Sequence, residues 1–93
     1  MTTTRPTILI IEDDPPIRRF LRSALEAEGM TVQDADTGRR GLTVAAARRP
    51  DLIILDLGLP DMEGLDVIRE LRAWARIPIL ILSAHSRELE KVA

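Results

Sequence analysis

Three short runs of the chain are apolar at nearly every position. They are Ile8–Ile11, Leu52–Leu55 and Ile77–Leu82, the last interrupted only by Pro78. A strand with one face in water alternates apolar and polar residues, whereas a strand buried on both faces does not. Strands of the second kind occur in parallel sheets that are covered by helices. The runs therefore predict an α/β fold with a parallel sheet.

The segments between these runs have helical periodicity. The first expected helix begins near Pro15 and Pro16, which its first turn tolerates, and ends at Gly29. A second helix is expected from about Thr37 to Arg49, and a third from Gly64. The residues expected to face inward are Ile17, Phe20, Leu21, Ala24 and Leu25 in the first helix, Leu42, Ala45 and Ala46 in the second, and Leu65, Ile68, Leu71 and Ala75 in the third.

Two further elements complete the expected order. Met30–Asp34 is expected to be a short strand, and a last helix is expected to begin after Ser86, a suitable N-cap residue. The predicted order is β-α-β-α-β-α-β-α. A chain of 93 residues is expected to form one domain, residues 1–93.

The composition excludes several classes of function. The chain contains no cysteine, so disulfides and thiolate metal sites are excluded. A net charge of -2 does not predict a nucleic-acid surface. No apolar run approaches the roughly 20 residues that span a bilayer, and the N-terminus lacks the apolar core of a signal peptide. We therefore expect a cytoplasmic location and no membrane partner.

Acidic residues follow two of the expected strands. Glu12, Asp13 and Asp14 follow the first run, and Asp56 follows Leu52–Leu55. Ligands of open parallel sheets bind beyond the carboxyl ends of the strands. If these two strands are neighbours, their carboxylates crowd one crevice and raise each other's pKa. A cation would relieve this repulsion, and ligands that are all oxygen favour Mg²⁺.

Asp56 is a candidate nucleophile as well as a ligand. A carboxylate that attacks phosphorus forms an acyl phosphate, and a bound cation supplies the positive charge that the reaction needs. Ser83, at the end of the fourth expected strand, is a candidate hydrogen-bond donor to a phosphoryl oxygen. The main chain around Gly58 is another, because glycine lets a backbone approach closely.

Simpler interpretations of these residues stay open. Asp56 taken alone fits a turn residue or helix cap, and Asp14 fits an N-cap. Ser83 also fits an ordinary strand-end hydrogen bonder, and His85 an exposed loop histidine. The arginine pairs, Arg18-Arg19 among them, are interpreted as solvated helix faces.

Rival chemistries lack required parts. The sequence contains no glycine-rich nucleotide loop. A Mg²⁺-dependent phosphatase of the haloacid dehalogenase kind needs an acid two residues after its nucleophile, and Gly58 stands there.

Three motifs together resemble the receiver domain of two-component response regulators. They are Ile8–Asp14, Asp51–Gly64 and Ile79–Ala84, and the resemblance covers essentially the whole chain. Ile17–Arg22 and Leu71–Trp74 are most similar to the OmpR-like subfamily, and within it to regulators of potassium transport. The resemblance implies a flavodoxin-like (CheY-like) doubly wound parallel sheet with strand order 2-1-3-4, the fifth strand and fifth helix being absent.

The resemblance also implies roles for the acidic residues. Asp56 would accept a phosphoryl group from a sensor histidine kinase, and Ser83 would be the switch hydroxyl. Asp13, Asp56 and the main-chain carbonyl of Gly58 would hold Mg²⁺, with Glu12 acting mainly through water. Such a domain is a phosphoacceptor that assists its own phosphorylation, not an enzyme that turns over.

Two departures from the family are serious, the absence of its fifth-strand lysine and the absence of the aromatic switch residue of that strand. The family lysine at the end of the fifth strand falls beyond Ala93, and Lys91 does not replace it. The resemblance thus implies an incomplete receiver domain whose parent dimerises through this domain and binds DNA through a separate effector domain. Ile77–Leu82 is then expected to be an edge strand that favours self-association. An alternative is a receiver-like interaction module that is not phosphorylated, although such a module has no reason to tolerate clustered acids.

Overall fold

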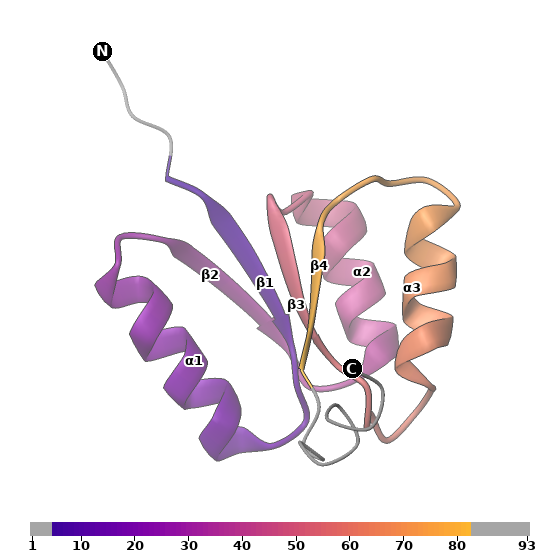
Figure 1. The fold of residues 1–93 in the computed structure, drawn as a ribbon, viewed down its shortest axis with the longest axis horizontal. Coiled ribbons are helices and arrows are strands. Elements are labelled where there is room, and N and C mark those ends of the chain that lie inside the picture. The colour runs from indigo at the N-terminus through magenta and orange to yellow at the C-terminus, as the bar shows by residue number, and fades with distance from the viewer. Residues whose placement is uncertain (1–4, 83–93) are drawn as a thin grey trace, which may run out of the picture.

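The structure, a computed structural model, describes residues 5–82. Four parallel strands form one sheet in the order β2-β1-β3-β4, as the resemblance implies. Helix α1 covers one face of the sheet, and α2 and α3 cover the other (Figure 1). The elements are β1 (Thr7–Ile11), α1 (Pro15–Ala27), β2 (Thr31–Ala35), α2 (Gly38–Arg48), β3 (Leu52–Asp56), α3 (Gly64–Arg72) and β4 (Ile79–Leu82).

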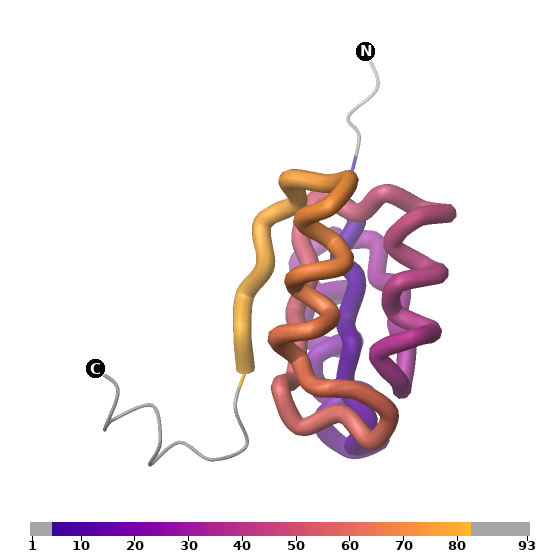
Figure 2. Tube along the Cα trace, turned by 90° about the vertical axis from the view of Figure 1, so that its right-hand side faces the viewer, coloured from indigo at the N-terminus to yellow at the C-terminus, as the bar shows by residue number. Residues whose placement is uncertain are grey.

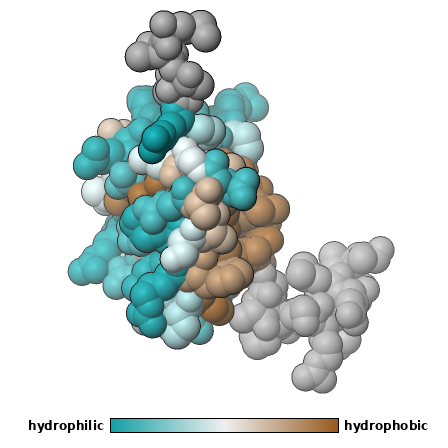
Figure 3. Space-filling view, turned by 90° about the vertical axis from the view of Figure 1, so that its left-hand side faces the viewer, coloured by the Kyte–Doolittle hydropathy of each residue, from teal (hydrophilic) through white to brown (hydrophobic). Residues whose placement is uncertain are grey.

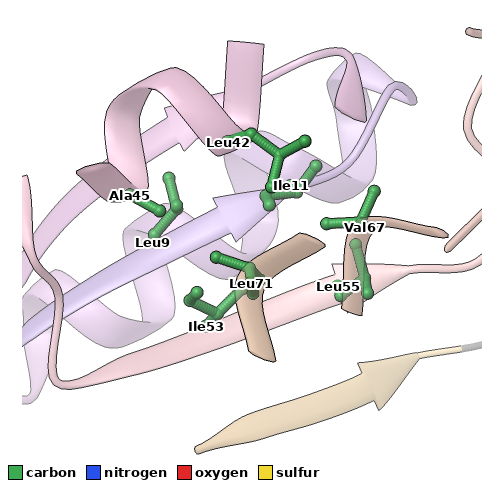
Figure 4. Close-up of a cluster of buried hydrophobic side chains, with 8 residues drawn as sticks. All are labelled: Leu9, Ile11, Leu42, Ala45, Ile53, Leu55, Val67 and Leu71. Carbon is green, nitrogen blue, oxygen red and sulfur yellow. The ribbon is translucent and has the colours of Figure 1, made fainter. Parts of the chain in front are cut away.

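Strands β1 and β3 form the buried centre of the sheet. In each, every residue after the first is buried, which confirms the interpretation of these two apolar runs. Side chains alternate between the faces, so that Leu9 and Ile11 of β1 lie with Ile53 and Leu55 of β3 toward α2 and α3. Figure 4 shows this core with the helix residues that complete it, Leu42, Ala45, Val67 and Leu71.

Strand β4 differs from the other two apolar runs. It begins at Ile79, since Pro78 has no N–H to donate, although the Pro78 carbonyl accepts from Ile53 N at 3.0 Å. Leu80 and Ile81 are exposed, so the prediction that this strand is buried on both faces is wrong. Within the described residues β4 is an edge strand, as expected. Figure 2 shows it in yellow at the left of the view, to the side of α3. Self-association through this edge stays a prediction.

Helix α1 has the expected bounds but a less buried apolar face. The chain leaves the helix at Gly29, whose φ of 87° suits glycine. Leu21 and Leu25 are half-buried against a second core cluster on this face, which consists of Ile8, Ile10, Val32 and Ile54. No α1 residue is fully buried, and Phe20 is 70% exposed. Within residues 5–82 no second helix packs beside α1 on this face of the sheet, so the flanks of its apolar stripe stay in solvent. Figure 3 shows apolar surface gathered beside hydrophilic surface on this side of the molecule. The other predicted inward residues that are exposed are Ile17 and Ala24.

Helix α2 begins after Thr37, whose hydroxyl accepts from Arg40 N at 3.1 Å. The prediction that Ala46 faces inward is wrong, because Ala46 is exposed. Gly41 lies on the inward face instead, and a Cβ there would lie 2.4 Å from Ile11 Cδ1. The helix therefore packs so closely on β1 that only glycine fits at this position.

Helix α3 is rotated relative to the predicted apolar face. Leu65, expected inward, is 61% exposed, whereas Val67 is fully buried. Leu71 is buried as predicted, and the helix ends at Arg72, before the half-buried Ala75.

Several expectations concern residues outside the described range. Ser83, His85 and the helix expected after Ser86 are among them. None of the helices within residues 5–82 is long and apolar enough to cross a membrane.

Candidate functional site

The register of the sheet brings the acids of two strands together. Ile11 of β1 pairs with Leu55 of β3, so Glu12 and Asp56 come next to each other at the carboxyl edge. Both continue the alternation of Ile10 and Ile54, which face α1. Glu12 stays attached to the sheet because its N–H donates to Ala35 O at 3.0 Å. The neighbouring strands predicted from the sequence thus place these two side chains on one side of the sheet.

Three carboxylates converge at this edge. Oxygen atoms of Glu12, Asp13 and Asp56 all lie within 4.8 Å of one another. Glu12 is 5% exposed and Asp56 is 6% exposed, whereas Asp13 is open to solvent. The cluster therefore has two buried acids and one accessible acid.

The electrostatic cost of this cluster falls on Glu12. Burial, which disfavours the charged form, raises the pKa of Glu12 from 4.5 to about 7. The charge of Asp56 and hydrogen bonds with Asp13 and Asp56 raise the pKa too. The Asp14 N–H, which donates to Glu12 Oε2 at 3.1 Å, opposes the rise.

Among the described residues no cationic side chain pairs with the carboxylates of the cluster. None of the five ion pairs found there involves Glu12, Asp13 or Asp56. Hard divalent cations prefer sets of carboxylate and carbonyl oxygens such as this one. The donor set therefore fits Mg²⁺.

Two sequence-based interpretations change near the site. Asp14 occupies the N-cap position of α1, but its side chain makes no capping hydrogen bond. Pro15 and Pro16, at the first two helical positions, have no N–H to donate, which leaves only the N–H of Ile17 as a possible capping partner. Gly58 lies beside the acids, and a Cβ there would be 3.8 Å from Asp56 Oδ2, which is an ordinary contact. Close approach therefore does not require glycine at this position. Ser83 lies outside the described residues.

Sequence reasoning missed two side chains that hold the site. Arg18, interpreted as a solvated helix residue, is half-buried and donates from Nη1 to Glu12 O at 2.7 Å. Asp61 accepts two main-chain hydrogen bonds from the start of α2, from Gly38 and Arg39. The position of Arg18, one turn into a helix that begins beside the acids, was the available signal. No local signal pairs Asp61 with residues more than 20 positions away.

Residues 8–93 match a family described as the response regulator receiver domain. The KDP operon transcriptional regulatory protein KdpE of Escherichia coli (strain K12) is 58% identical over 86 residues, which are 92% of this chain and 38% of that protein. The transcriptional regulatory protein KdpE of Mycobacterium tuberculosis (strain ATCC 25618 / H37Rv) is 47% identical over 85 residues, 91% of this chain and 38% of that protein. The chain therefore spans well under half the length of these curated relatives.

Solved structures give the same picture of the fold. The chemotaxis response regulator CheY4 of Vibrio cholerae superposes with a TM-score of 0.86 at 29% identity, covering 96% of this chain and 77% of that one. The Francisella response regulator 1452 receiver domain gives a TM-score of 0.82 at 26% identity, covering 95% and 76%. The expected CheY-like fold with strand order 2-1-3-4 is confirmed.

Proposed function

Because this chain belongs to the response regulator receiver domain family, we propose that Asp56 accepts a phosphoryl group from a sensor histidine kinase. One observation carries the proposal. The oxygens of Glu12, Asp13 and Asp56 converge within 4.8 Å, with no cationic side chain paired to them in the described part of the chain. A folded protein tolerates such repulsion where a cation is to bind.

The proposed cation is Mg²⁺, held by Asp13, Asp56 and the main-chain carbonyl of Gly58. Glu12 would act mainly through bridging water, as the resemblance to the family implies. When bound, the cation supplies positive charge for the transferring phosphoryl group. Arg18 keeps the acidic segment in place through its hydrogen bond to Glu12 O.

In the proposed step, an oxygen of Asp56 attacks phosphorus. A P–O bond forms, the P–N bond to the kinase histidine breaks, and the imidazole nitrogen keeps the electron pair. The product is an acyl phosphate that stays on Asp56, so the reaction is a single transfer and not turnover. Burial of Asp56 at 6% exposure limits the access of water to this product. Ser83 is the proposed hydrogen-bond donor to the phosphoryl group.

The parent protein is proposed to be a phosphorylation-controlled transcription regulator of the OmpR-like subfamily in the cytoplasm. The similarity to KdpE proteins named as transcriptional regulators supports this assignment. Dimerisation through the receiver domain and DNA binding through an effector domain belong to the same proposal, because the chain spans 38% of those relatives.

The experiment compares the wild-type chain with Asp56→Asn and Asp51→Asn after incubation with acetyl phosphate and Mg²⁺. Asp51 precedes β3 at the opposite end of the strand, where its carboxylate accepts from Thr7 N at 2.8 Å. Intact mass should rise by one phosphate in the wild type and in Asp51→Asn, but not in Asp56→Asn. A phosphate gain that survives Asp56→Asn would refute the assignment of the phosphoacceptor.

A second measurement addresses the alternative function. If a chain that also carries the fifth strand and the family lysine gains no phosphate, and Mg²⁺ causes no NMR shifts at residues 12–13 and 56–58, the protein is better described as an interaction module that is not phosphorylated.

A further inference from the structure

The carboxylate of Asp61 connects the loop after β3 to the start of α2. Its Oδ1 accepts from Gly38 N at 2.8 Å, and its Oδ2 accepts from Arg39 N at 2.9 Å. These two hydrogen bonds hold the pKa of Asp61 below its ordinary value, so the side chain is an anion at neutral pH. The loop, residues 57–63, is the segment that runs from Asp56 to α3.

The start of α2 depends on this connection. The first N–H groups of a helix have no partner within the helix. Thr37 Oγ1 accepts from Arg40 N, but the N–H groups of Gly38 and Arg39 are bonded by Asp61. Met62 packs at the same place, since a Cβ on Gly38 would lie 2.4 Å from Met62 Cγ. The loop and the helix end therefore fit each other through both polar and apolar contacts.

The two ends of the loop are also held together. Gly64 N donates to Leu57 O at 3.3 Å, and a Cβ on Gly64 would lie 2.8 Å from Leu57 Cα. Gly58 lies between these fixed points, with its backbone beside the Asp56 carboxylate. The direction of the Gly58 carbonyl therefore depends on the loop, whereas Asp56 is held by the sheet.

We propose that Asp61 is a positioning residue, which holds the loop 57–63 on α2 and thereby keeps the Gly58 main chain beside the Glu12–Asp13–Asp56 cluster. The inference rests on the proposed function, because it assigns the loop to the same divalent-cation site. Outer residues that orient ligands affect metal affinity without touching the metal. An untethered loop spends less time in the binding-competent arrangement, and the apparent dissociation constant rises in proportion.

The test compares Asp61→Ala, Asp61→Asn and the control Asp36→Ala. Asp36 is a second acidic residue near the start of α2, where its carboxylate accepts from Arg40 Nη1 at 2.9 Å, and it makes no hydrogen bond to the loop. Asp36→Ala therefore removes one negative charge and leaves the tether intact. Asp61→Asn removes the charge and keeps one acceptor, its side-chain carbonyl, whereas its NH₂ group cannot accept from the second N–H.

Two readouts are taken on the folded 93-residue chain. The first is the Mg²⁺ dissociation constant, measured by NMR titration. Urea unfolding in the same buffer checks that every variant is fully folded under the titration conditions. We expect Asp61→Ala to weaken binding about tenfold and Asp36→Ala less than about twofold. Asp61→Asn should fall between Asp61→Ala and the wild type, because it keeps one of the two acceptors. The second is amide hydrogen exchange without metal, which should accelerate in residues 57–63 of Asp61→Ala only.

The outcomes separate the two proposals. Wild-type affinity in Asp61→Ala, or an equal loss in Asp36→Ala, would overturn the positioning role. Absence of Mg²⁺ binding in the wild-type chain would overturn the proposed function. In that case the exchange experiment still tests whether Asp61 holds the loop on α2. Unchanged exchange in residues 57–63 of Asp61→Ala would overturn that role.

Discussion

Replacing Glu12 by glutamine should stabilise the metal-free chain at alkaline pH. Burial and the nearby acids raise the pKa of Glu12 from 4.5 to about 7, so the folded state binds this proton more tightly than the unfolded state. Between these two pH values the unfolded chain has lost the proton and the folded chain keeps it. The free energy of unfolding therefore falls as pH rises through this window, and the loss is complete above it.

The size of the effect follows from the two pKa values. Their difference corresponds to about 3 kcal/mol, an upper limit because local rearrangement relieves part of the burial. Glutamine keeps a carbonyl oxygen for the Asp14 N–H and carries no charge at any pH. At about pH 8.5 the variant should exceed the wild type by up to this amount, and at about pH 5 by less than about 1 kcal/mol.

The assay is urea unfolding followed by far-UV circular dichroism, with EDTA and then with Mg²⁺. Glu28→Gln, at an exposed position after α1, provides the same substitution without burial and should change little. In Mg²⁺ the advantage of Glu12→Gln should shrink or reverse, since the variant loses a carboxylate near the cation. The reasoning is refuted if the variant is no more stable than the wild type in EDTA at alkaline pH.

Three further predictions concern packing and metal binding. Gly41→Ala should cost about 1–3 kcal/mol in urea unfolding, because its new methyl group would overlap Ile11 Cδ1, and a neutral effect would contradict the packing. Leu71→Ala should cost about 2–5 kcal/mol and Phe20→Ala less than about 0.5 kcal/mol, since Leu71 is fully buried and Phe20 is 70% exposed; similar losses would count against the placement of α1. Mg²⁺ at about 100 times its dissociation constant should raise the free energy of unfolding by about 2.7 kcal/mol in the wild type. Asp56→Asn should lose most of this gain in thermal unfolding, and an equal gain would show that the cation binds elsewhere.

Local sequence patterns were enough to predict the sheet and the position of its acids. Uninterrupted apolar residues in β1 and β3 predict burial on both faces, and an acid directly after each strand must lie at the carboxyl edge. Once β1 and β3 are neighbours, alternation puts Glu12 and Asp56 on the same side. These conclusions need only local patterns and one assumption about strand order.

Which helix faces pack, and what holds the loop after β3, could not be predicted from local patterns, because both depend on contacts between distant elements. Periodicity predicted Ala46 of α2 and Leu65 of α3 as inward residues, but both are exposed. The buried positions that periodicity did not predict include Gly41 in α2 and Val67 in α3. A glycine gives no apolar signal, yet it is what lets α2 approach Ile11. The carboxylate of Asp61 likewise bonds to a helix end more than 20 residues earlier in the chain. Such contacts depend on how far apart two helices or strands lie in the folded chain. That separation is set by all the side chains packed between them, and no local sequence pattern contains it.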